Sequence, residues 1–506
     1  MRIVLNPQAT LAETDIGSVK ISLKSRDDIA KTLLGLQHLY NQRELRDEVF
    51  EILKEVVPNK ADGKGKARIS VGRPGMEQWR ILVLGTLRLS LNTDYDRLVD
   101  LANHHEVIRK MLGHPGVMND LDDTEYTLQT VKDNLRLFTP ELLARISEVV
   151  VRGGHELIKK GDSRRYSEKL NARVDSFVVE TNVHYPTDVN LLWDAIRKTV
   201  MICGRLSADR DWSEWRQYQH NVRAFKRKSH HISKLKRSNA RDEVKREAKN
   251  QEIQAAHRDY IEDAERYLER ARATHAKLEK LGKTNLSLLV ELMELDGYMK
   301  HAERQIDQIR RRVLNGETIP HDEKVFSIFQ SHTEWISKGK AGVPVELGVK
   351  VAVVEDQYRF ILNHRVLQKT EDAEAAMPLI KDTQKRFGTL HSASFDKGFH
   401  SPDNQTELGN IVELVILPKK GNLSAEDAER ESDPDFVRLR KKHSAVESAI
   451  NALEHHGLDR CLDHGIVGFK RYVALAVLAR NVLRLGQILH QQDQDRRKRT
   501  PERRAA

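Results

Sequence analysis

The spacing of apolar residues changes twice along the chain, and each change separates regions of different predicted structure. In the first 165 residues, apolar positions recur at the spacing of amphipathic helices. Helices are predicted over residues 25–57, 76–112, 124–136 and 140–160. The second of them breaks at Asn92-Thr93-Asp94, where Thr93 or Asp94 can cap a new helix. Residues 1–165 are therefore predicted to form a helical N-terminal region.

Strand patterns begin after residue 165. An apolar run at 174–180 predicts a buried strand, and a helix with Leu191, Leu192, Ala195, Ile196 and Val200 follows it. Further strands are predicted at 347–354, 358–362, 390–395 and 411–417, the first two forming a hairpin across Glu355-Asp356-Gln357. Helices are predicted at 371–387, 434–456 and 467–490. This order predicts an α+β fold, with a mixed sheet flanked by helices and encoded by residues 166–205 and 317–490.

The intervening residues, 206–316, lack the strand pattern. Apolar or small residues from Ile253 to Leu281 follow alternating steps of three and four, and the pattern resumes from Leu288 to Val313 after a short polar turn. Two heptad helices joined by a tight turn predict an antiparallel coiled-coil hairpin. We therefore expect an α-helical insertion whose helices are each about 30 residues, or roughly 45 Å, long.

Composition adds a preference for an anionic partner. The 506-residue chain is 39% hydrophobic and carries a net charge of +10, with a pI near 9.3. Nucleic acid is the first candidate for such a partner. Cys203 and Cys461 are its only two cysteines, which disfavours a disulfide framework and favours a reducing compartment. We expect no signal peptide and no membrane span, since the longest apolar run, 473–479, is short, and we expect a cytoplasmic protein.

Three carboxylates are the strongest chemical signal. Asp175 interrupts the apolar strand 174–179, Asp396 follows the strand 390–395, and Glu447 lies on an amphipathic helix. A carboxylate in an apolar strand is costly to bury unless it is paired or binds a metal. Oxygen ligands from two strands and a helix suggest a site for Mg²⁺ of the kind used in phosphoryl chemistry. Taken singly, Glu447 reads as a solvated helix residue and Asp396 as a loop residue.

The residues around these carboxylates resemble a known family, the DDE transposases of bacterial insertion sequences, and most closely the ISNCY group and its relatives. The likeness covers residues 174–202 and 323–490, and faintly 77–115. It is carried by Val174-Asp175-Ser176 through Tyr185-Pro186-Thr187-Asp188, Ser337-Lys338-Gly339-Lys340-Ala341, Glu346-Leu347-Gly348-Val349-Lys350, Asp396-Lys397-Gly398-Phe399, His443-Ser444-Ala445-Val446-Glu447 and Ala479-Arg480-Asn481-Val482-Leu483-Arg484-Leu485.

The resemblance implies an RNase H-like catalytic domain in which Asp175, Asp396 and Glu447 hold two Mg²⁺ or Mn²⁺ ions. Two metals can activate a nucleophile, hold it in line and neutralise the leaving oxygen. The implied activity is cleavage of DNA at the ends of a mobile element and joining of the 3′-hydroxyls to target DNA. The implied partners are double-stranded DNA, both terminal inverted repeats and target, and further copies of the chain in a homodimer or higher oligomer. The implied location is the bacterial cytoplasm, in association with the nucleoid.

Two alternatives remain open at this point. One is a related RNase H-like DNA nuclease or resolvase that cleaves without joining. The other is a non-catalytic DNA-binding protein, such as a transposase remnant. Metal-dependent nicking separates the enzymes from the remnant, and a strand-joining product separates the transposase from the nuclease.

Basic residues provide the candidate DNA contacts. Related transposases often have Arg four residues before the glutamate and Lys seven after it, where this chain has His443 and Glu454. Lys441, Lys442 and Arg460 are candidates to replace them. Residues 221–250 contain eleven Lys or Arg against three Asp or Glu, and the tail at 491–506 is basic and predicted to be disordered. The candidate contacts are Arg88, Arg97, Arg109, Lys110, Lys226, Arg227, Lys228, Lys234, Lys236, Arg237, Lys338, Lys340, Lys441 and Lys442.

Two other motifs match known ligand-binding patterns only in part. Gly282-Lys283-Thr284 ends like a phosphate-binding loop, but Lys277 stands where the first glycine belongs, so no nucleotide cofactor is expected. His455, His456, Cys461 and His464 imitate zinc spacing without the paired cysteines of a zinc site.

Overall fold

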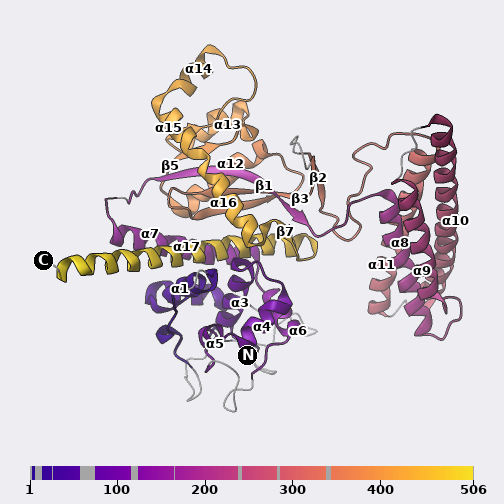
Figure 1. Ribbon diagram of the computed structural model, residues 1–506, viewed down its shortest axis with the longest axis horizontal. Coiled ribbons are helices and arrows are strands. Elements are labelled where there is room, and N and C mark those ends of the chain that lie inside the picture. The colour runs from indigo at the N-terminus through magenta and orange to yellow at the C-terminus, as the bar shows by residue number, and fades with distance from the viewer. Residues whose placement is uncertain are drawn as a thin grey trace. The chain divides into compact units, whose positions relative to one another are not determined.

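The computed structural model describes residues 3–5, 14–24, 27–56, 75–115, 124–164, 166–237, 242–281, 285–337 and 344–504 (Figure 1). The fold is mixed α+β, as predicted. The chain divides into two compact units, which we describe separately. The sheet unit comprises Met1–Asn182 and Ile336–Ala506, and the bundle unit comprises Val183–Trp335.

A mixed sheet forms the centre of the sheet unit. Its strands are β1 (Leu170–Thr181), β2 (Glu334–Ser337), β3 (Val345–Glu355), β4 (Ile361–Leu367), β5 (Leu390–Phe395), β6 (Leu414–Ile416) and β7 (Arg460–Cys461). The order is β2-β3-β1-β5-β6, with β4 also pairing with β3 and β7 with β1. β3 runs antiparallel to β1 and β4, whereas β5 is parallel to β1 and β6 is parallel to β5.

The two faces of the sheet bury different residues because side chains alternate along a strand. Phe177 and Val179 of β1 join Val351 and Val353 of β3 in one core, which also contains the N-terminal helices. Val174, whose side chain points to the opposite face of β1, belongs to the other core, which contains residues of α12 (Asp372–Phe387). The predicted hairpin at 347–362 is confirmed as β3 and β4.

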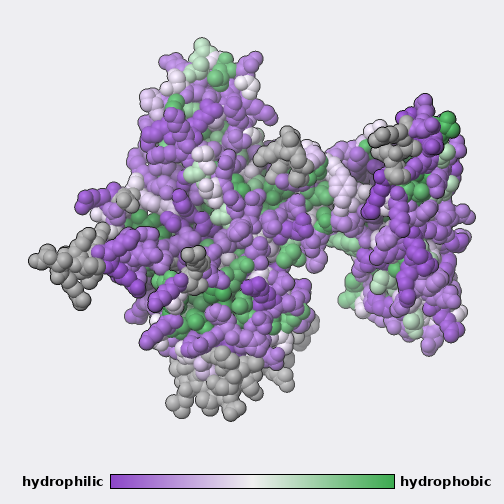
Figure 2. Space-filling view, viewed as in Figure 1, coloured by the Kyte–Doolittle hydropathy of each residue, from purple (hydrophilic) through white to green (hydrophobic). Residues whose placement is uncertain are grey.

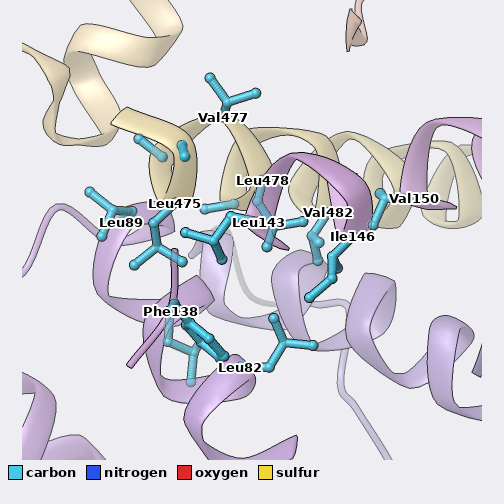
Figure 3. Packing of buried hydrophobic residues seen from close by; sticks show 14 of the residues in the cluster. Leu82, Leu89, Phe138, Leu143, Ile146, Val150, Leu475, Val477, Leu478 and Val482 are labelled. Atoms are coloured by element: carbon cyan, nitrogen blue, oxygen red, sulfur yellow. The ribbon is translucent and has the colours of Figure 1, made fainter. Parts of the chain in front are cut away.

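The N-terminal helices share the first of these cores with the C-terminal helix α17 (Gly465–Arg504). Figure 3 shows Leu82 and Leu89 of α3, with Leu143 and Ile146 of α7, packed beside Leu475, Leu478 and Val482 of α17. The helices are α1 (Asp28–Asn41), α2 (Arg43–Lys54), α3 (Gln78–Ser90), α4 (Tyr95–His104), α5 (Glu106–Met111), α6 (Leu128–Leu135) and α7 (Pro140–Gly161). Residues 1–165 therefore are not a separate domain, because their apolar faces are covered by a helix from the other end of the chain.

Among the described residues, α17 alone has the length and composition of a membrane span, and 83% of its most apolar window is buried within the protein. It is therefore a core helix of this unit. It also continues to Arg504, so the tail predicted to be disordered is helical through that residue.

Local sequence signals account for several helix ends. Asp94 accepts a hydrogen bond from the Arg97 amide, and so caps α4 at the predicted break. Thr139 caps α7, with Pro140 at its first position. The helix predicted at 434–456 is instead divided at Ser444 into α15 (Pro434–His443) and α16 (Ala445–Leu453). The remaining short helices are α13 (Pro402–Glu407) and α14 (Ala425–Ser432).

The bundle unit contains α8 (Asp188–Ala208), α9 (Tyr218–Leu235), α10 (Glu243–Leu281) and α11 (Leu286–Ile309). The heptad residues Tyr260, Ala264, Leu295 and Ala302 are buried as predicted, but they share one core with residues of α8 and α9. The insertion is therefore a four-helix bundle and not an isolated coiled-coil hairpin. It begins at Val183 instead of residue 206, because α8 packs within it.

Candidate active site

Adjacent parallel strands place Asp175 and Asp396 side by side. The register pairs Arg173 with Ser394 and Val174 with Phe395, so the next pair along the strands is Asp175 and Asp396. The backbone of Asp396 is still extended, and the alternation of side chains therefore continues through it. Neighbouring strands lie about 4.8 Å apart. The two carboxylates consequently occupy equivalent positions on one face, where β5 ends.

Asp175 experiences the negative charge of this site. Burial, and after it the nearby carboxylates of Asp396, Asp372 and Glu447, raise the pKa of its carboxyl to about 6. A hydrogen bond of 2.7 Å from the Ser176 amide to Asp175 Oδ1 acts in the opposite direction. Asp396 and Glu447, the other two carboxylates predicted from the sequence, thus lie within electrostatic reach of Asp175, together with a fourth carboxylate, Asp372.

Glu447 lies in the first turn of α16 and is exposed. The opposite side of this helix buries Val446, Ala449 and Ile450 in the core that contains Phe177 of β1. Packing on that side of α16 therefore fixes the helix over the face that carries Asp175. Asp396 is likewise exposed, so the site is open to solvent.

His443, where related transposases often have arginine, also belongs to this site. Its Nδ1 lies 3.0 Å from Ser394 Oγ, two residue pairs along the sheet from the two aspartates. Burial lowers the pKa of His443, with Arg173 acting in the same direction and the carboxylates of Asp396 and Glu447 opposing it. The imidazole is therefore held mainly neutral at pH 7, and it is a hydrogen-bonding group beside the carboxylates.

Arg173 holds the base of the site in place. Its guanidinium lies 3.0 Å from the carboxylate of Glu355 on β3 and also donates a hydrogen bond to the carbonyl of Asp356. Arg173 is largely buried, so this pair ties β1 to β3 two residues before Asp175. Burial nevertheless raises the pKa of Glu355 to about 7, which Arg173 partly opposes.

Asp372 is the residue that sequence reasoning missed. It begins α12, and its Oδ2 lies 3.1 Å from Lys350 Nζ of β3 and near the backbone of Gly398 in the Asp396 motif. Its other oxygen, Oδ1, is buried without a hydrogen bond. An acidic residue in the first turn of a helix is ordinary, and no local signal distinguished this one.

These carboxylates supply only oxygen ligands, which suits Mg²⁺ or Mn²⁺. Across the described part of the chain, no three His, Cys, Asp or Glu side chains lie close enough together to hold a metal ion as they stand.

Two arginines predicted to contact DNA are instead structural. Arg88 is 3% exposed and binds Asp463 at 2.9 Å and the Tyr95 hydroxyl at 3.0 Å. Arg109 is fully buried and donates a hydrogen bond to the Thr124 carbonyl. The prediction is therefore wrong for these two residues, because their guanidinium groups are enclosed in the core of the sheet unit.

The other candidate DNA contacts in the sheet unit differ in whether they are exposed and whether their charge is already paired. Arg97, Lys441 and Lys442 are exposed, and no ion pair of theirs is found among the described residues. Lys110 is paired with Glu106 on its own helix. Lys338 and Lys340 lie outside the described residues.

In the bundle unit, the basic residues of α9 separate into two groups. Lys226, Arg227, Lys234 and Arg237 are exposed. Lys228 instead binds Asp259 and Asp263 of α10, at 2.8 and 2.5 Å. Lys236 has its pKa lowered by partial burial and by Arg312. Lys236 is nevertheless exposed, so the exposed basic surface at α9 includes it as well as the first four residues, on a unit whose surface is mostly hydrophilic in Figure 2.

Comparison of the chain with protein-family models, curated proteins and solved structures finds no match.

Proposed function

We propose that this protein is a DDE-type transposase that cleaves DNA at the ends of a mobile element and joins the 3′-hydroxyls to target DNA. The observation that carries the proposal is the convergence of Asp175, Asp396 and Glu447 from two adjacent parallel strands and a helix packed on their face. The sequence resemblance predicted these same three residues as a set, although 272 positions separate the first from the last.

The strand order supports an RNase H-like catalytic domain. Three strands, β4, β3 and β1, are successively antiparallel, and β5 and β6 extend the sheet in parallel from β1. This is the arrangement expected of such a domain, with one carboxylate in the central strand, one after the next parallel strand and one on a later helix. The bundle unit is an insertion between β1 and β3 in this scheme.

The site fits divalent metal ions chemically. The raised pKa of Asp175 reflects burial first and then the negative charge of the neighbouring carboxylates, and a bound cation would offset both effects. Asp396 and Glu447 are exposed, so their side chains can change rotamer at little cost to reach a shared ion. Bound there, two ions would activate the nucleophile and stabilise the leaving oxygen. The residues of this chain would position the DNA: exposed Lys441 and Lys442, close in sequence to Glu447, offer charge for its phosphates.

The test is metal-dependent nicking of DNA that contains the element's ends. We expect Asp175→Asn, Asp396→Asn and Glu447→Gln each to lower the nicking rate more than about a hundredfold, since losing even an outer partner of a metal ligand costs 10–100-fold. DNA affinity should stay near wild type, because none of the three contacts phosphate directly. Asp403→Asn, at an exposed aspartate of α13, is the matched control and should nick normally.

Near-normal nicking by any of the three variants would remove that residue from the proposed metal site. Nicking without a strand-joining product would favour the nuclease alternative, and DNA binding without nicking would favour a non-catalytic remnant.

A further inference from the structure

The bundle unit contains a pocket that the proposed chemistry does not use. It has a volume of about 230 Å³ and lies where α8 begins and α11 ends. Its walls include Tyr185, Asp188, Arg312, Lys324, Phe326 and Trp335. All of these residues fall within the bounds of the bundle unit, of which Trp335, in β2, is the last residue.

Aromatic rings form one side of the pocket. The rings of Phe326 and Trp335 lie 5.6 Å apart at 35°, and Tyr185 meets Trp335 edge-on at 5.9 Å. His321 extends the row, 5.3 Å from Phe326. Tyr185 is 61% exposed, so a ring surface faces solvent at the entrance. Such a row suits a flat, aromatic ligand.

Charge decides which flat ligand the pocket favours. Aromatic rings beside an acid can hold a cationic amine, but here Arg312 and Lys324 outnumber Asp188. Lys236 adds a further positive charge near Arg312 and Asp188. Lys324 is exposed, with no ion pair found for it in the described ranges. The pocket therefore disfavours a cation and favours a ligand that combines an aromatic ring with negative charge.

Asp188 adds hydrogen-bonding capacity. It is 8% exposed, and its Oδ2 lies 2.6 Å from Arg312 Nη2 but makes no hydrogen bond of good geometry. A buried carboxylate oxygen in this state can accept a hydrogen bond from an N–H group of a ligand.

We propose that this pocket binds an unpaired nucleobase of a DNA strand together with its phosphate. The base stacks on Phe326, Trp335 and Tyr185 and donates an N–H to Asp188, while Arg312 and Lys324 face the phosphate. Base stacking on aromatic side chains, combined with basic residues along the backbone, is how proteins bind unpaired strands. The proposal rests on the proposed function only in taking DNA as the partner.

The test measures binding by the full-length protein in EDTA, where no cleavage can interfere. Three fluorescent duplexes are compared: fully paired, with one extrahelical adenine, and with an abasic residue at that same position. We expect the wild type to bind the extrahelical adenine about tenfold more tightly than either of the other two, which is within the range for stacking of one base. Tyr185→Ala and Trp335→Leu should abolish this preference.

Lys324→Gln should weaken binding of the adenine-containing duplex severalfold, whereas Lys280→Gln, at an exposed lysine near the end of α10, should leave it unchanged. Because Tyr185 is exposed, its variant tests the pocket even if Trp335→Leu misfolds.

Equal binding of the adenine and abasic duplexes by the wild type would overturn the proposal, as would a preference that survives Tyr185→Ala. Free deoxyadenosine monophosphate should not displace the duplex below millimolar concentration. If it competes as well as the strand, the pocket is a mononucleotide site instead. None of these readouts depends on nicking. The proposal for the pocket can therefore be refuted without affecting the proposal for the carboxylate site, and the carboxylate proposal can be refuted without affecting the pocket.

Discussion

Asp175 is ionised at neutral pH in surroundings that favour its neutral form. Desolvation within β1 is the larger cause, and the three neighbouring carboxylates add to it. In the folded protein the carboxyl therefore holds its proton up to about pH 6, against 3.8 for an unperturbed aspartate. The raised pKa of Asp175 also has a consequence for the stability of the folded protein.

Because the folded-state pKa of Asp175 is raised, the folded state binds more protons than the unfolded state between pH 4 and 6. Its contribution to the free energy of unfolding therefore falls as pH rises through that window and stays low above it. We predict that Asp175→Asn, measured without divalent metal, raises the free energy of unfolding at pH 8 by about 1–2 kcal/mol. The full shift corresponds to at most about 3 kcal/mol, and partial solvent access reduces it.

Urea unfolding at pH 8 and pH 5 measures this effect. At pH 5 the variant should gain only about half as much, because the aspartate of the unfolded chain is then ionised while that of the folded protein still holds its proton. A gain of equal size at both pH values would assign the effect to packing instead of charge.

Site residues that conflict with the local sequence pattern could be identified from the sequence alone. Asp175 could be found because it interrupts an apolar strand, and Asp396 because it ends one. Arg88 could not be recognised as buried, since its partner Asp463 lies 375 residues away and no local pattern records that pairing. Asp372 was missed for the opposite reason, because it fits its helix start too well to stand out.

At the scale of elements, α9 combines structural and exposed basic residues. We predict that replacing Lys226, Arg227, Lys234 and Arg237 with Gln reduces the slope of log affinity for DNA against log salt by about 2–4, since each phosphate contact contributes about 0.9. Titration of a labelled duplex between 50 and 200 mM salt gives the slope.

Lys228→Gln is the matched control for the α9 surface. It lies on the same helix but is held by Asp259 and Asp263, so the slope should not change. If the fourfold variant also keeps the wild-type slope, α9 is a solvated face without a role in DNA binding.

The heptad pattern located two helices of this unit correctly and misjudged their surroundings. A repeat of apolar positions specifies which face of a helix is buried, but it does not specify how many helices bury it. Here Phe225 of α9 stacks on Tyr260 of α10 at 4.3 Å, a contact that adds a third helix to the predicted pair. The amphipathic pattern of α8 was equally compatible with packing on the sheet.

At the scale of the molecule, the two units have separate cores. A glycine in each unit can be replaced to test whether the two units unfold separately. A Cβ at Gly486 of α17 would lie 1.8 Å from the Lys31 carbonyl of α1, and one at Gly35 would lie 2.3 Å from the Val482 carbonyl. The two helices therefore cross in close backbone contact. Gly297 of α11 has no atom within 4 Å of such a Cβ.

We predict that Gly486→Ala lowers the free energy of unfolding of the sheet unit by about 3 kcal/mol or more, because a backbone carbonyl cannot move aside as a side chain can. Gly297→Ala should raise that of the bundle unit by about 0.5–1 kcal/mol, as expected for alanine in a helix interior. Calorimetry should show the first change in one transition and the second in another. A shift of both transitions by either variant would mean that the units unfold together.

The position of α17 also determines when the protein can complete its fold during translation. The bundle unit ends at residue 335, and α17 begins at residue 465, so about 130 residues separate the two on the ribosome. At 5–20 residues per second, synthesis of this segment takes roughly 6–26 s. During that time the nascent bundle can fold, whereas the apolar faces of α1, α3 and α7 stay exposed until α17 has been synthesised. A chain that terminates early in this interval would carry a finished bundle but no assembled carboxylate site. If the protein acts on DNA as proposed and α9 contacts it, such a truncated product would bind DNA without cleaving it and would compete with the full-length protein.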